Sequence, residues 1–117
     1  MTDLGSSGRF TVALTYLAQT IDSRAAGGDA SSSWTAKLLS KGPDACAAKA
    51  REEAEEFVEA VLKESDERVA SEAADMLYHA LVALRSRGVR LDDVAAALEG
   101  RQGTSGIVEK ASRNTSD

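Results

Sequence analysis

The chain has 117 residues, of which 43% are apolar and 4% aromatic, and its formal net charge is −5 with a pI near 4.9. This length suits a single domain, and the acidic balance argues against nucleic-acid binding, which needs a basic footprint. No apolar run approaches the ~20 residues of a membrane-spanning helix, the first residues do not resemble a secretion signal, and Cys46 is the only cysteine. We therefore expect a cytoplasmic domain that contacts neither nucleic acid nor membrane.

Ala, Leu, Glu and Arg predominate and runs of β-branched residues are nearly absent, which predicts an all-α fold. Residues 1–9 are expected to form a flexible tail. Phe10 begins a helical repeat of apolar residues that predicts a helix to about Arg24. The small and polar residues 25–32 indicate a loop.

Cap residues divide the middle of the chain. Ser33 is the expected N-cap of a short helix that ends at Lys41-Gly42. Pro43 suits the first turn of a long helix that runs to about Lys63. Cys46 lies on the apolar stripe of this helix, which predicts a buried thiol rather than a nucleophile.

A second long helix is expected to follow a short turn. Ser65 or Asp66 can cap its start, and Gly88 ends it after basic residues that suit the helix dipole. A last helix is expected over about Asp92–Arg101, and residues 103–117 are expected to form the second flexible tail. The two long helices should pair as an antiparallel hairpin.

Two acidic pairs lie at helical spacing on the predicted hairpin. Glu53 and Glu56 share one face of the first long helix, and Glu72 and Asp75 share one face of the second, because residues three apart are neighbours on a helix. Each pair is at or beside the edge of an apolar stripe. Carboxylates that face one another in this way repel strongly unless a cation lies between them. Oxygen ligands favour Mg²⁺, with Mn²⁺ as an alternative.

The simpler alternative is a solvated acidic face, since 28% of the residues are charged. Under that reading the protein is a non-catalytic helical dimerisation module. Dimerisation is expected in either case, because a single hairpin leaves much of its apolar stripe uncovered. Two hairpins would bury the stripes in a four-helix bundle, so we predict a homodimer with the acidic clusters near the subunit boundary.

The sequence resembles a known family along nearly its whole length. The runs that carry the resemblance are Ser33–Leu39 (SWTAKLL), Lys41-Gly42, Lys49 with Glu52–Glu56 (EEAEE), Glu72–His79 (EAADMLYH), Arg87–Val94 and Ser105–Arg113. They are similar to bacterial phosphoribosyl-ATP pyrophosphohydrolases. The acidic motif alone is shared with the wider MazG-like all-α nucleotide pyrophosphohydrolases. Two positions depart from the family pattern: Arg51 stands where Gly is common and Trp34 where Tyr is common.

The resemblance implies a reaction and a site. The reaction is Mg²⁺-dependent hydrolysis of phosphoribosyl-ATP to phosphoribosyl-AMP and pyrophosphate, the second step of histidine biosynthesis, by a homodimer. It implies Glu52 or Glu53 as the general base. The implied metal ligands are drawn from Glu52, Glu53, Glu56, Glu72 and Asp75. A house-cleaning nucleoside triphosphate pyrophosphohydrolase with the same metal site is the alternative within this superfamily.

Basic residues in the matched runs are the expected phosphate contacts. These substrate-binding candidates are Lys37, Lys41 and Lys49, the tail residues Lys110 and Arg113, and His79. Each lysine is also compatible with a solvated surface charge, and His79 with a packed histidine. A lone aromatic early in a helix, such as Trp34, more often packs in the core, whereas stacking on the adenine is the alternative.

Overall fold

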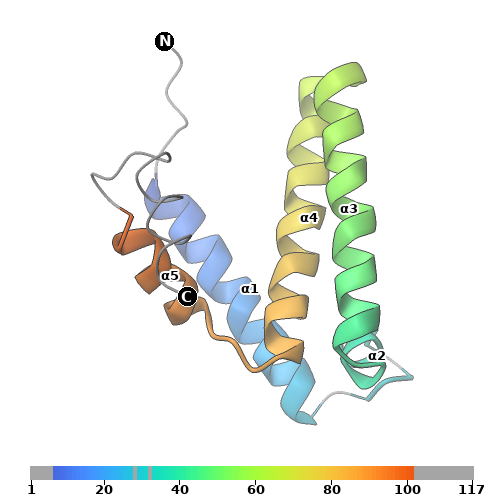
Figure 1. Cartoon of the computed structure of the whole chain (residues 1–117), viewed down its shortest axis with the longest axis vertical. Coiled ribbons are helices and arrows are strands. Elements are labelled where there is room, and N and C mark those ends of the chain that lie inside the picture. Colours follow the sequence, from blue (N-terminus) through green and yellow to red (C-terminus); the bar gives the residue numbers. More distant parts are fainter. Residues whose placement is uncertain (1–6, 28, 32, 102–117) are drawn as a thin grey trace, which may run out of the picture.

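The computed structural model describes residues 7–27, 29–31 and 33–101, and within these ranges the regular secondary structure is all helix, with no strand. This confirms the all-α prediction. Figure 1 shows the order of the helices. They are α1 (Ser7–Gly27), α2 (Trp34–Ser40), α3 (Pro43–Lys63), α4 (Asp66–Ser86) and α5 (Leu91–Glu99).

Local sequence signals determine most of the helix boundaries. The side chains of Ser33 and Ser65 accept backbone N–H bonds at the starts of α2 and α4. This confirms Ser33 as an N-cap and shows that Ser65, rather than Asp66, caps α4. Gly42 and Gly88 have φ angles of 92° and 72°, which other residues adopt only with strain. These two glycines therefore allow the sharp turns before α3 and after α4.

The predicted ends of α1 were wrong in extent. The helix begins at Ser7, inside the segment expected to be a flexible tail, and continues to Gly27. The Gly and Ser residues that follow Ala25 and Ala26 favour a loop, yet both alanines are helical, and alanine has the highest helix propensity. The C-terminal tail of residues 103–117 lies outside the described residues.

The α3–α4 hairpin dominates the molecule. In Figure 1 the two helices rise side by side, with α2 near their base and α1 and α5 diverging from them. The core lies where α1 and α2 meet the hairpin, and it consists of Ile21, Leu38, Cys46, Leu81 and Val82. The buried position of Cys46 confirms its predicted role as a small apolar residue.

The buried residues of α3 form a line along one side of the helix, here called the buried seam, and one of them is charged. Cys46, Glu53 and Ala60 are its buried residues, and each lies seven positions after the last, which is two helical turns. An apolar side chain would be expected at the centre of such a seam. The sequence placed Glu53 at the edge of the apolar stripe, but the structure places it inside the seam.

The outer part of the hairpin keeps apolar side chains in solvent. Val58, Val61 and Leu62 lie on one face of α3, and Leu62 is 71% exposed. The other described helices pack nearer the base of the hairpin (Figure 1). Among the described helices we find none with the length and apolar character needed to cross a membrane.

Candidate metal and substrate site

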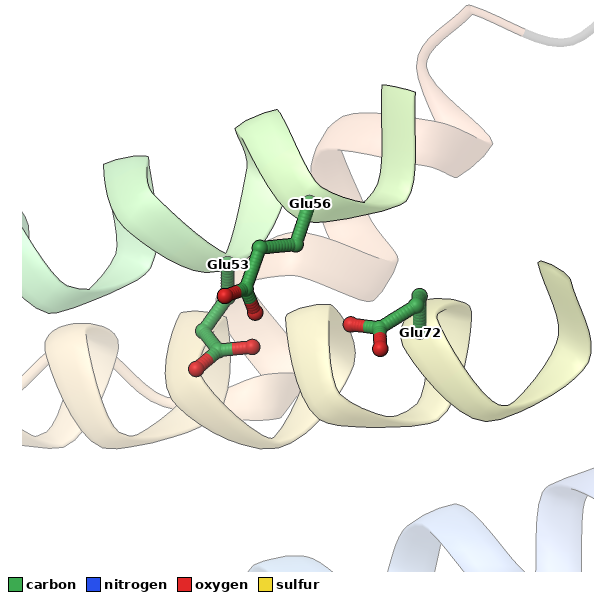
Figure 2. Close-up of side chains that lie close together, drawn as sticks. All are labelled: Glu53, Glu56 and Glu72. Atoms are coloured by element: carbon green, nitrogen blue, oxygen red, sulfur yellow. The ribbon is translucent and has the colours of Figure 1, made fainter. Parts of the chain in front are cut away.

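Three carboxylates converge between the two long helices. Glu53 and Glu56 project from α3 and Glu72 projects from α4, and Figure 2 shows the three groups directed toward a common region. Each residue offers a carboxylate oxygen, and these oxygens all lie within 4.8 Å of one another. The spacing of three on α3 and the antiparallel pairing with α4 produce this convergence.

Two of the three carboxylates are buried. Glu53 is 7% exposed and Glu72 is 6% exposed. Oε2 of each residue is buried and makes no hydrogen bond. Leaving a buried charged group without a partner is costly, so such atoms are usually satisfied by an ion, water or ligand. An all-oxygen donor set of this kind fits Mg²⁺ or Mn²⁺.

Two basic residues pair with the buried carboxylates from one helical turn away. Lys49 Nζ lies 3.3 Å from Glu53 Oε1 and 3.4 Å from Glu52 Oε1. Arg68 forms an ion pair with Glu72 through Nη2. Burial lowers the pKa of Lys49, but the hydrogen bonds and negative charges of Glu53 and Glu52 outweigh this effect and raise it. Lys49 and Arg68 therefore offset part of the negative charge of the cluster.

Glu56 shows the repulsion that remains. The negative charge of Glu53 and a hydrogen bond to its carboxyl raise the pKa of Glu56, with smaller contributions from burial and from Glu72 and Glu52. A shared proton reduces the repulsion between neighbouring carboxylates. A divalent cation would do the same without a proton.

The other predicted acidic ligands lie at the margin of the cluster. Asp75 and Glu52 are exposed, and neither belongs to the group of converging oxygens. At about 100° per residue, Glu72 and His79 share one direction on α4, whereas Asp75 is turned about 60° toward solvent. Glu52 remains connected to the site through Lys49.

His79 links α4 to α2. It is buried, its Nδ1–H donates to the Asp75 carbonyl at 2.8 Å, and its Nε2 accepts from Trp34 Nε1 at 3.2 Å. A neutral imidazole with its proton on Nδ1 satisfies both bonds. Tyr78 on α4 and Thr35 on α2 share a second hydrogen bond between their hydroxyls. His79 therefore positions α2 against α4, as its packed-histidine alternative proposed.

Trp34 is not a core residue, contrary to the more common behaviour of a lone aromatic in a helix. Its side chain is 45% exposed. Lys49 Nζ lies 5.9 Å from the centroid of its ring, within the range of a cation–π contact. Lys49 thus lies between the aromatic ring and the carboxylate cluster.

The remaining predicted phosphate contacts are less closely associated with the cluster. Lys37 and Lys41 are exposed on and just after α2. Lys110 and Arg113 lie outside the described residues. Sequence reasoning missed Arg68, although the i, i+4 spacing to Glu72 is a signal for an ion pair that could have found it.

Two hollows of the described surface lie near the helices that carry the site. The larger, about 560 Å³, lies between α1, α4 and α5, and none of its lining residues belongs to the carboxylate cluster. The smaller, about 270 Å³, lies between α1, α2 and α4. It is lined by Thr20, Arg24, Ser33, Trp34, Thr35 and Tyr78. Trp34 therefore lines the smaller hollow and also contacts Lys49, which forms ion pairs with the acidic cluster.

An all-helical hairpin with convergent buried carboxylates and adjoining cations defines a candidate metal-dependent hydrolase of phosphorylated substrates. Comparison with known proteins narrows this class. The sequence model described as phosphoribosyl-ATP pyrophosphohydrolase matches residues 14–102. The chain belongs to this family.

Similar curated proteins carry the name phosphoribosyl-ATP pyrophosphatase. One from Cereibacter sphaeroides is 55% identical over 100 residues, covering 86% of this chain and 96% of that protein. One from Jannaschia sp. is 54% identical over 100 residues, covering 86% and 97%. One from Ruegeria sp. is 56% identical over 97 residues, covering 83% and 91%. The match extends over most of each protein, so the matched region includes α3 and α4.

Proposed function

We propose that this chain hydrolyses phosphoribosyl-ATP to phosphoribosyl-AMP and pyrophosphate, with Mg²⁺ or Mn²⁺ held by Glu53, Glu56 and Glu72. The reaction is the second step of histidine biosynthesis. Family membership and the names of the similar proteins support the reaction. The observation that carries the metal site is the pair of buried carboxylate oxygens without partners. A cytoplasmic location remains a prediction.

The residues around the cluster have separable roles in this proposal. When bound, the cation would neutralise charge on phosphate oxygens and activate a water molecule for attack. Lys49 neutralises phosphate charge beside the carboxylates. Glu52 or Glu53 accepts the proton of the attacking water. Asp75 lies at the margin of the site, where its backbone carbonyl holds His79.

The reaction is tested by measuring pyrophosphate release from phosphoribosyl-ATP with and without Mg²⁺, beside ATP and dCTP. Metal-dependent release from phosphoribosyl-ATP alone supports the proposal. Release mainly from ATP or dCTP would instead make the chain a house-cleaning pyrophosphohydrolase. No release from any substrate would favour a non-catalytic dimerisation module.

The two candidate bases can be separated with Glu52→Gln. If Glu52 is the base, this variant loses turnover but keeps the metal-induced increase in melting temperature, because the three convergent carboxylates remain. If Glu53 is the base, Glu52→Gln keeps most of its turnover. Arg51→Gln, which alters a neighbouring exposed charge, is the control for nonspecific changes at this end of the site.

We also propose that two copies of the chain pair through their hairpins to form a four-helix bundle. The support is the exposed apolar face of Val58, Val61 and Leu62, which lies where other described helices do not cover α3. Pairing would remove this face from water at about 25 cal/mol per Å² of apolar surface. Sedimentation equilibrium tests the proposal, since a monomer at micromolar concentration would contradict it.

A further inference from the structure

Trp34 occupies an unusual position for a tryptophan. A large apolar ring that is 45% exposed gives up much of the free energy that its burial would provide. It is nevertheless held in one orientation, because its indole N–H donates to the buried His79. His79 is itself held by the Asp75 carbonyl. The ring is thus exposed and preorganised at once, which lowers the entropic cost of binding a ligand against it.

The surroundings of the ring indicate the chemistry of that ligand. Lys49 lies 5.9 Å from the ring centroid and 3.3 Å from the Glu53 carboxylate. A molecule that contacts the ring can therefore place a phosphate beside Lys49 and the carboxylate cluster. Nucleotides combine a flat base with a phosphate chain, and bases stack on aromatic side chains whatever their sequence context.

The smaller hollow adds a second group of contacts. Beside Trp34 it is lined by Ser33, Thr35, Tyr78 and Arg24. The hydroxyls of Thr35 and Tyr78 are hydrogen-bonded to each other, and the Ser33 hydroxyl accepts the Ala36 N–H while its own proton stays available to a ligand. Hydroxyl groups can bind ribose, and a guanidinium binds phosphate through paired N–H groups. A phosphoribosyl substituent carries both a ribose and a phosphate beyond those of ATP.

We propose that Trp34 and the hollow between α1, α2 and α4 form the subsite for the base and its phosphoribosyl group. Trp34 stacks on the purine, and Arg24 binds the phosphate of the phosphoribosyl group. His79 is a positioning residue that fixes the indole ring. This inference rests on the proposed reaction for the identity of the substituent, whereas the stacking of a purine nucleotide stands on the geometry alone.

Trp34 is the only tryptophan of the chain, so its fluorescence reports the subsite directly. The purified wild-type protein is titrated with AMP and with phosphoribosyl-AMP. Ribose 5-phosphate, which has no base, is the control. We expect saturable quenching by both nucleotides and none by ribose 5-phosphate. Equal quenching by ribose 5-phosphate, or no quenching by either nucleotide, would overturn stacking.

Kinetic variants test the same subsite independently of fluorescence. Trp34→Leu should raise KM for phosphoribosyl-ATP roughly 5- to 150-fold with little change in kcat, because stacking on an aromatic ring contributes about 1–3 kcal/mol. Trp34→Phe keeps a stacking face and should remain near the wild-type KM. Circular dichroism checks that both variants keep their helices. A Trp34→Leu variant with wild-type KM would refute the role of the ring.

Arg24→Gln tests the second contact. It should weaken binding of phosphoribosyl-AMP, measured by Trp34 fluorescence, while AMP binding stays unchanged. Equal effects on both ligands would refute the assignment of Arg24 to the phosphoribosyl phosphate. If the wild-type enzyme released no pyrophosphate from phosphoribosyl-ATP, the proposed reaction would fail, but quenching by AMP would still decide whether Trp34 stacks on a purine.

Discussion

Replacing Glu53 by Gln removes a buried negative charge from the carboxylate cluster while nearly preserving the size of the side chain. Glu53 and Glu72 offer oxygens within 4.8 Å of each other. Two unit charges at about that distance repel by ~3.5 kcal/mol at an effective dielectric constant near 20. Lys49 and Arg68 offset part of this repulsion through ion pairs worth about 0–1 kcal/mol each.

The metal-free Glu53→Gln variant loses this repulsion and only the Lys49 pair, so it is expected to be more stable than the metal-free wild type by about 2.5–3.5 kcal/mol. For a domain of this size, each kcal/mol raises Tm by roughly 4–8 °C. Bound metal should narrow this difference. The wild type gains about 2.7 kcal/mol when Mg²⁺ is present at a hundred times its Kd, and the variant gains less because it lacks one ligand.

Thermal unfolding followed by circular dichroism, across a Mg²⁺ titration and a parallel Mn²⁺ titration, measures both effects. Glu55→Gln is the matched control, because Glu55 lies on the same helix, is exposed and is not part of the cluster. A Glu53→Gln variant with a wild-type increase in Tm on adding metal would refute the metal site. A metal-free variant less stable than the metal-free wild type would refute the proposed repulsion.

Further predictions concern the same site and the proposed subunit interface. Glu56→Gln and Glu72→Gln should each lower kcat by about 100-fold or more, a loss of ~3 kcal/mol in transition-state stabilisation, without loss of far-ultraviolet circular dichroism; wild-type turnover in both would contradict the site. The pKa of Glu56 is raised in the folded protein above its ordinary value of 4.5. Protonated Glu56 therefore stabilises the metal-free fold fully below pH 4.5, and this stabilisation is lost as the pH rises through the pKa of the folded protein. Metal-free Tm should therefore fall over this pH range, less so with saturating Mg²⁺ or in Glu56→Gln, and an identical slope in all three would exclude Glu56 as the cause. Leu62→Glu should shift the proposed dimer toward monomer in sedimentation, whereas Glu59→Gln on the same helix should not.

The helices could be predicted because their determinants are local. Ser33, Pro43 and Ser65 mark helix starts through single cap or first-turn preferences, and Gly88 marks an end through its positive φ. The start of α1 was misplaced because Ser7 and Gly8 are typical of a tail, although the chain forms helix there. Residues 8–13 are exposed, so packing against the other described helices does not account for this start.

The candidate site was only partly predictable. Helical spacing identified Glu53, Glu56 and Glu72, which the structure brings together. The sequence could not show that Asp75 turns toward solvent, because this depends on the rotation of α4 about its axis against α3. The bond between Trp34 and His79 joins residues that are 45 positions apart, and such a pairing follows from packing rather than from spacing.

Lys49 and Arg68 act as counterions of the carboxylate cluster, and this affects the order in which metal and nucleotide bind. A cation that enters among the carboxylates competes with an ammonium and a guanidinium already bound there. Substrate phosphates would provide these displaced groups with new partners. Metal and nucleotide should therefore strengthen each other's binding by the same factor. We expect the protein to bind free Mg²⁺ weakly and to acquire it together with its nucleotide, so that the charged centre is completed only when there is a substrate to cleave.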